Sequence, residues 1–106
     1  MSDFQKAFGK NLRELRRHRA MTQETLAEKS ELSLQHVGAI ERGVGNPTLN
    51  SVERIANALD ISIGELFVLD GFNLTPEKLR KELMNRVASV SDEKLLNFYI
   101  ASRFIL

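Results

Sequence analysis

The sequence has no cysteine and no tryptophan, and only two histidines and two prolines among its 106 residues. Without cysteine there can be no disulfide scaffold and no thiolate metal site, and two histidines offer little for an imidazole site. No apolar run approaches the ~20 residues that a membrane-spanning helix needs, and the first residues lack the features of a signal peptide. We therefore expect a cytoplasmic protein with no metal, no cofactor and no membrane partner.

The net charge is also small, because 15 Lys and Arg residues balance 14 Asp and Glu residues. A net charge of +1 is by itself a weak argument against a nucleic-acid partner. The charges are unevenly distributed: residues 1–19 carry +4, residues 20–70 carry −5 and residues 71–106 carry +2. A basic first segment is compatible with either a solvated helix face or a surface for DNA.

Apolar spacing is helical almost throughout. Phe4, Phe8, Leu12 and Leu15 recur at steps of three or four residues, which predicts a first helix ending near Arg19. Further helices are expected to begin after residues that are good N-caps, namely Thr22, Ser33, Thr48, Ser62 and Thr75. The pattern predicts an all-α fold, with a five-helix domain over residues 1–70 and a helical extension over residues 71–106.

Two short helices joined by a tight turn suggest a helix-turn-helix unit, but periodicity alone does not separate it from any small helical bundle. Five short segments are more specific to one kind of helical protein. They are TQETLAEKS (22–30), IERG (40–43), NPTL (46–49), IANAL (55–59) and ISIGELF (61–67). Over residues 8–67 the chain closely resembles the phage repressor/Cro-type family of helix-turn-helix regulators. The resemblance implies a repressor-like fold and a DNA-binding function.

The same resemblance implies which residues meet DNA. Residues 23–30 would cross the backbone, and residues 34–42 would enter the major groove as the recognition helix. Gln35 is the strongest candidate for base readout, because a Gln amide can pair bidentately with adenine. The full set of expected DNA-binding residues is Thr22, Gln23, Ser33, Leu34, Gln35, His36, Ala39, Arg42 and Asn46.

Several of these residues also have plain structural roles open to them. Thr22 and Ser33 suit helix caps, Leu34 could pack across the turn, and His36 could be a solvated helix residue. The family alignment places Arg16 and Glu41 where a largely buried ion pair joins the first and third helices. Removing one partner of such a pair typically costs ~3–5 kcal/mol, so Glu41 is expected to be structural.

The family often has glycine at the end of the first helix and in the turn between the two helices. Here those positions hold Ala20 and Glu31. If both keep a left-handed backbone, each costs about 1 kcal/mol. Neither departure touches the recognition face.

Residues 75–106 lie outside the resemblance and are rich in apolar side chains for so short a segment. We expect them to form a homodimer, because family members usually bind palindromic operators and need two recognition helices ~34 Å apart. The residues expected at the dimer contact are Leu79, Leu83, Val87, Leu96, Tyr99, Ile100 and Phe104. The alternative is a tail folded back on its own domain.

The alternative functions are an enzyme, an antitoxin-type protein and an adaptor. An enzyme is not expected, because the chain has no metal-ligand spacing, no glycine-rich phosphate loop and no nucleophile elbow. An antitoxin-type protein would bind DNA and use the C-terminal extension to bind a partner protein. An adaptor without DNA binding is the third. We expect a sequence-specific transcriptional regulator, most simply a repressor, that binds double-stranded DNA as a homodimer.

Overall fold

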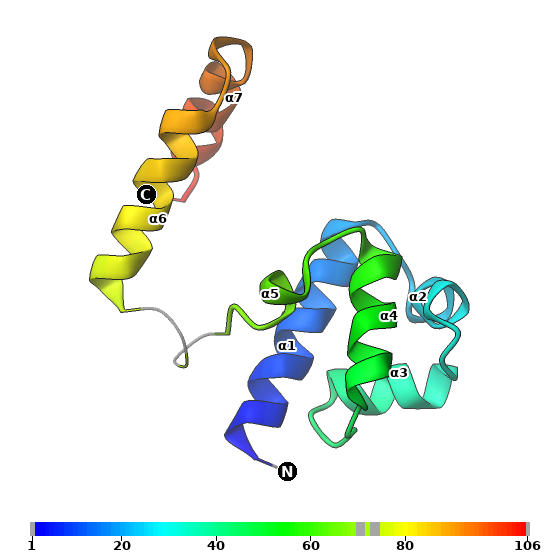
Figure 1. Cartoon of the computed structure of the whole chain (residues 1–106). Coiled ribbons are helices and arrows are strands. Elements are labelled where there is room, and N and C mark those ends of the chain that lie inside the picture. Colours follow the sequence, from blue (N-terminus) through cyan, green and yellow to red (C-terminus); the bar gives the residue numbers. More distant parts are fainter. Residues whose placement is uncertain (1, 70–71, 73–74, 106) are drawn as a thin grey trace. The chain divides into compact units, whose positions relative to one another are not determined.

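The structure, a computed structural model, describes residues 2–69, 72 and 75–105, and these residues form helices joined by turns and loops, without strands. The N-terminal helices are α1 (Asp3–His18), α2 (Gln23–Ser30), α3 (Leu34–Glu41), α4 (Leu49–Leu59) and α5 (Ile63–Leu66) (Figure 1). They are followed by α6 (Pro76–Ser89) and α7 (Asp92–Ser102). The expected all-α fold is confirmed. The chain divides into an N-terminal unit, residues 1–73, and a C-terminal unit, residues 74–106.

A serine or threonine hydroxyl caps the N-terminus of nearly every helix. The five expected caps, Thr22, Ser33, Thr48, Ser62 and Thr75, each accept a hydrogen bond from the backbone N–H three residues later. Ser2 adds a reciprocal capping box at the start of α1, in which its hydroxyl and the Gln5 side chain each accept from the other's backbone N–H. These bonds satisfy helix N–H groups that have no partner within the helix.

Three turns use a left-handed residue that is not glycine. Ala20, Glu31 and Asp60 have φ values of 54°, 58° and 55°. Ala20 and Glu31 are the two positions where the resemblance led us to expect this conformation. Glu31 ends α2 and makes the turn toward α3, so the helix-turn-helix carries the modest backbone strain that a side chain adds in this region.

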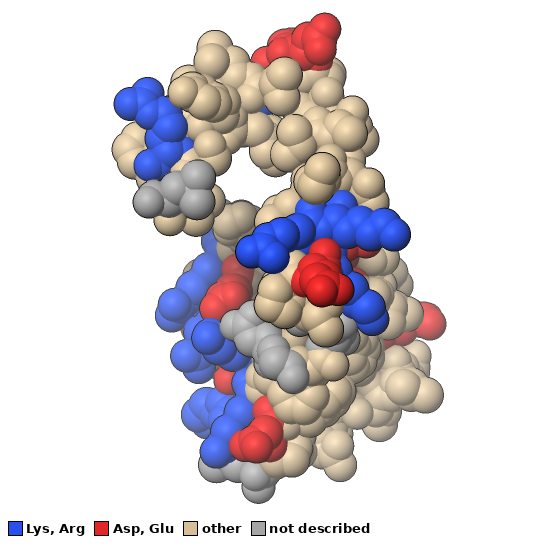
Figure 2. Space-filling model, turned by 90° about the vertical axis from the view of Figure 1, so that its left-hand side faces the viewer, with Lys and Arg blue, Asp and Glu red and all other residues tan. Residues whose placement is uncertain are grey.

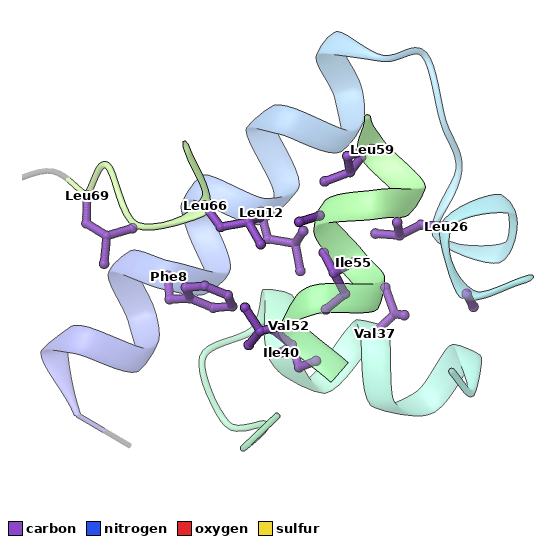
Figure 3. Packing of buried hydrophobic residues seen from close by; sticks show 12 residues of the cluster. Phe8, Leu12, Leu26, Val37, Ile40, Val52, Ile55, Leu59, Leu66 and Leu69 are labelled. Carbon is purple, nitrogen blue, oxygen red and sulfur yellow. The ribbon is translucent and has the colours of Figure 1, made fainter. Parts of the chain in front are cut away.

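The hydrophobic core of the N-terminal unit lies between α1, α4 and the pair α2 and α3 (Figure 3). Its most deeply buried side chains are Leu12, Leu26, Val37, Ile40, Ile55, Leu59 and Leu66. Leu49 has the spacing of an apolar face with Val52 and Ile55 of α4, but its side chain is 87% exposed. It is the first residue of α4 and lies one turn before Val52, where burial begins.

Gly9 lets α1 approach α3 closely. A Cβ at this position would overlap the backbone carbonyl groups of Ile40 and Glu41 at the end of α3. Glycine is therefore required here for packing, not for an unusual φ. The contact sets α1 directly against the last turn of α3.

The C-terminal unit differs from the N-terminal unit in the burial of its helices. Over residues 76–102, neither α6 nor α7 has a buried residue. Leu83, Leu96, Tyr99 and Phe104 are among its exposed large hydrophobic side chains, and Phe104 is 86% exposed. The side chains of Leu83, Met84, Val87 and Ala88 line a shallow, mostly apolar hollow on α6.

Candidate nucleic-acid interface

The helix-turn-helix is formed by α2, the turn at residues 31–33 and α3. The inner residues of both helices, including Leu26, Ala27, Val37 and Ile40, are buried in the core. α2 packs against α3 and α4, and α3 packs also against α1. The core therefore holds one side of α3 in place and leaves its other side at the surface of the N-terminal unit.

The outer side of α3 carries the residues expected to face the groove. Gln35 is exposed and Leu34 is 45% exposed, so Leu34 is not a core residue. His36 and Ala39 are half-buried and border the same side. The structure thus brings together a neutral hydrogen-bonding amide, an imidazole and two apolar side chains on one rigid helix.

Two of the expected DNA-binding hydroxyls have structural hydrogen bonds. Thr22 Oγ1 accepts from the Thr25 N–H at 3.0 Å and lies 3.0 Å from Thr25 Oγ1. Ser33 Oγ accepts from the His36 N–H at 3.0 Å. Both side chains are exposed at the starts of α2 and α3, where the helix dipoles are positive. Both hydroxyls therefore cap their helices, and any phosphate contact would be additional to that role.

Arg16 and Glu41 form a bidentate ion pair between α1 and α3. Arg16 Nε donates to Glu41 Oε2 at 2.7 Å, and Arg16 Nη2 donates to Glu41 Oε1 at 3.0 Å. The remaining Arg16 Nη1 donates to the carbonyl oxygen of Met21 at 2.7 Å, just before α2. Both residues are buried, so this arrangement fixes three segments relative to one another.

Two further residues join this pair, and sequence reasoning did not find either contact. Gln23 Nε2 donates to Glu41 Oε1 at 3.1 Å, and Arg13 Nε lies 3.5 Å from the same oxygen. We call Arg13, Arg16, Gln23 and Glu41 the Glu41 cluster. The available signal was spacing, because Arg13 precedes Arg16 by three residues and so shares its face of α1.

The cluster keeps Glu41 ionised. Burial alone would raise the pKa of this carboxyl, but the hydrogen bonds from Arg16 and Gln23, the charge of Arg16 and the contact with Arg13 outweigh burial. The net effect lowers the pKa of Glu41 below its ordinary value of 4.5. The carboxylate is therefore a permanent acceptor at neutral pH.

The loop that follows α3 holds the last two expected DNA-binding residues. Arg42 and Asn46 are both exposed. The backbone N–H groups of Val44 and Gly45 donate to the carbonyl oxygen of Ala39 at 3.0 and 2.9 Å, and Gln5 Nε2 donates to the carbonyl oxygen of Gly45 at 3.4 Å. These bonds hold the loop against α3 and α1.

An apolar cleft of about 180 Å³ lies behind this loop. Phe4, Phe8 and Phe67 line one part of it, and the loop residues Gly45, Asn46 and Pro47 line another. Phe67 also contacts both other rings, with centroids 6.3 Å from Phe4 and 5.2 Å from Phe8. The loop is thus backed by aromatic packing as well as by hydrogen bonds.

The basic residues of the chain are not spread evenly. On the face shown in Figure 2, Lys and Arg side chains lie in groups, with Asp and Glu side chains among them. Lys6, Lys10 and Arg17 of α1 are exposed.

Over residues 2–69, 72 and 75–105, no group of three His, Asp or Glu side chains could hold a metal ion. Within the same described part, no helix is both long and apolar enough to cross a membrane.

Comparison with known proteins places this geometry in a family. The helix-turn-helix family HTH_3 matches residues 12–66, about half of the chain. The helix-turn-helix-type transcriptional regulator y4dJ of Sinorhizobium fredii is 39% identical over 64 residues, which are 60% of this chain and 83% of that protein. The immunity repressor protein of Bacillus phage phi105 is 38% identical over 58 residues, which are 55% of this chain and only 40% of the repressor.

A solved structure agrees with the sequence relatives. The restriction-modification controller protein C.AhdI from Aeromonas hydrophila superposes with a TM-score of 0.59 at 46% identity, over 59% of this chain and 96% of that one. The chain therefore belongs to the helix-turn-helix family of transcriptional regulators, of the Cro and phage-repressor type. The expected repressor-like fold of the N-terminal unit is confirmed. The family match ends at residue 66 and leaves α6 and α7 outside it.

Proposed function

We propose that this helix-turn-helix transcriptional regulator is a repressor that binds a palindromic DNA operator as a homodimer. Residues 34–42, which comprise α3 and Arg42, would enter the major groove. The observation that carries the proposal is the division of α3 into two sides. One side is anchored in the core through Val37 and Ile40, and the other presents Leu34 and Gln35 at the surface.

Base readout is assigned to the outer side of α3. The Gln35 amide has a donor and an acceptor that match N7 and N6 of adenine. His36 can donate to a guanine or a phosphate, and Leu34 and Ala39 can contact a thymine methyl group. The rigid helix keeps these groups in one register along the groove.

Backbone binding is assigned to residues that flank α3 on both sides. Thr22, Gln23 and Ser33 lie at or beside the positive ends of α2 and α3, and Arg42 and Asn46 lie at the start of and within the following loop. Each phosphate that is neutralised by a cation releases counterions. Operator affinity should therefore fall steeply as salt concentration rises, in spite of a net charge of only +1.

Dimerisation is assigned to residues 71–106. Within this segment Leu79, Leu83 and Val87 of α6 and Leu96, Tyr99 and Ile100 of α7 are exposed, as is Phe104. Helices that bury nothing in one chain gain apolar contacts when they pack against a second copy. A dimer would also supply the two recognition helices that a palindrome requires.

The protein would act by binding in the cytoplasm, without catalysis. A partner protein bound by residues 71–106 is the second candidate for this segment, since its exposed apolar side chains fit either use. The mass of the purified protein separates the two: a homodimer has about twice the 12.0 kDa of the chain. A chain that is monomeric alone and purifies with a neighbouring gene product would favour the partner protein.

Selection of bound DNA from a random pool tests the operator proposal directly. The full-length protein should enrich two inverted half-sites about one helical turn apart, near 34 Å between centres. A transcription assay on the selected site should then show repression. No enrichment at low salt, or enrichment of a single unrepeated half-site, would contradict the dimeric operator.

The variant Gln35→Ala tests the assignment of base readout. It should lose discrimination at one base pair in each half-site, worth about 1–3 kcal/mol, and keep its helical fold, because the side chain is exposed. Mobility shifts on the selected operator and on single-base variants measure this. Unchanged base preference in Gln35→Ala would contradict the role given to the amide.

A further inference from the structure

Glu41 raises a question for a DNA-binding protein, because it places a carboxylate at the end of the recognition helix. Its Oε1 atom is contacted by groups from two other helices: Arg16 and Arg13 of α1 at 3.0 and 3.5 Å, and Gln23 of α2 at 3.1 Å. Two guanidinium groups against one carboxylate leave the Glu41 cluster with net positive charge. The carboxylate side chain itself is fully buried, so it would not repel a phosphate at the surface.

The Glu41 carboxylate also fixes the orientation of the Gln23 side-chain amide. An ionised carboxylate can only accept hydrogen bonds, so the NH₂ group of Gln23 must face Glu41. The NH₂ group has two protons, and one remains for another acceptor. Gln23 is only half-buried at the first position of α2, where the helix dipole is positive. The amide is thus held in one orientation with a donor to spare.

The absence of a side chain at Gly38 leaves space for the Arg42 guanidinium group. A Cβ added at Gly38 would lie 3.0 Å from Arg42 Nη1 and 3.8 Å from Gln23 Oε1. Arg42 Nη1 and Gln23 Oε1 therefore both lie close to Gly38. Arg13, the α1 member of the cluster that lies nearer the surface, has 40% of its side chain exposed. Gln23 and Arg13 thus meet at Glu41 Oε1, and Arg42 lies at Gly38, one turn earlier on α3.

We propose that Glu41 is a positioning residue for DNA-backbone binding: it holds Gln23 and Arg13 as a preformed pair of donors for a single phosphate, with Arg42 beside them. Glu41 itself does not touch DNA. Holding the donors before binding removes part of the entropy that two free side chains would lose on contact. This inference rests on the proposed DNA-binding function, and it gives the buried ion pair a second role beyond stability.

A double-mutant cycle on the selected operator tests the coupling. Gln23→Ala should weaken binding roughly tenfold in the native background, as expected for one lost hydrogen bond to a charged group. In the Glu41→Gln background the same change should weaken binding by less than about threefold, because the neutral amide no longer fixes Gln23. Gln35→Ala is the matched control, and its effect should be the same in both backgrounds. Equal effects of Gln23→Ala in both backgrounds would overturn the proposal.

Glu41→Gln leaves Arg16 buried without its ionic partner and could unfold the protein, so a second measurement uses the native Glu41. Ethylation of individual operator phosphates should reveal one phosphate per half-site whose modification blocks binding. Gln23→Ala and Arg13→Ala should each relieve the block at that same phosphate, whereas a merely structural role would leave the pattern unchanged. Relief at two different phosphates, or at none, would overturn the proposal. A wild-type protein that binds no specific DNA would refute the proposed function and this inference with it.

Discussion

The two units of this chain have similar proportions of apolar residues but use them in opposite ways. The N-terminal unit buries twelve hydrophobic side chains in one core. The C-terminal unit has comparable residues at helical spacing, yet α6 and α7 bury none. The difference is one of geometry, because five helices can surround a core and two short helices cannot.

The apolar side chains of the two units differ in what they contact. In the N-terminal unit the core holds α3 at the surface, and twelve hydrophobic side chains are buried in that core. In the C-terminal unit the apolar side chains remain available, which supports an interface as their purpose. The buried ion pair has no counterpart among the described residues of the C-terminal unit, where neither α6 nor α7 has a buried residue.

Removing residues 75–106 tests the comparison most strongly. The N-terminal unit has its own core and should stay folded, with a cooperative thermal transition by circular dichroism. Operator binding should weaken by about 10²–10⁴-fold, because the two half-sites are no longer bound by one linked pair. Light scattering should show a monomer. An unchanged dimer would refute the role given to the C-terminal unit.

A matched pair of truncations compares the two apolar surfaces directly. Ile55→Ala removes a fully buried side chain of α4 and should lower the free energy of unfolding by about 2–5 kcal/mol. Leu83→Ala removes an exposed side chain of α6 and should instead raise the dimer dissociation constant. Chemical denaturation and sedimentation measure the two effects. A large loss of monomer stability in Leu83→Ala would show that α6 folds back on its own chain.

The pH dependence of stability should come in part from Glu41. Its pKa is lowered in the folded state, so its contribution is complete above the ordinary pKa of 4.5 and is lost as pH falls through the lower folded value. Thermal melting between neutral pH and pH 3 should show this decline in the wild type. Glu41→Gln should start from a lower melting temperature and decline less. Parallel curves for both proteins would exclude Glu41 as the titrating group.

The smallest expected effect concerns the turn before α3. Glu31 has a φ of 58°, which glycine adopts without a Cβ penalty, so Glu31→Gly should raise the free energy of unfolding by up to about 1 kcal/mol. Glu28→Gly, in the interior of α2, is the control and should lower it by about 1 kcal/mol. Denaturant titration measures both. A loss in Glu31→Gly would mean that the Glu31 side chain makes a stabilising contribution greater than the strain.

Local features of the fold were predictable because they depend on neighbours in the sequence. Five N-caps followed from single Ser and Thr residues placed before apolar periods. The helix-turn-helix followed from five short segments in the right order, and the family comparison confirms it. Leu49 has the helical spacing of the α4 core residues and is nevertheless 87% exposed, since periodicity does not tell where along a helix burial begins.

The candidate site was predictable only as a set of residues on α2, α3 and the loop. The family resemblance, not periodicity, placed Gln35 on the outer side of α3. It could not place Gln23 and Arg13 on one oxygen of Glu41, because these residues come from three helices whose approach depends on packing. Gly9 shows the reason: a single missing Cβ decides how closely α1 lies against α3.

The sequence alone determined that this protein is helical, that it lacks the residues for disulfides and thiolate metal sites, and that it resembles the repressor and Cro regulators. Those conclusions depend on composition and on local spacing, which the chain carries before it folds. Only the tertiary structure decided that Arg13 and Gln23 join Arg16 at the buried Glu41, and that the apolar side chains of α6 and α7 remain uncovered. Burial depends on which helices pack together, and that is a property of the folded chain.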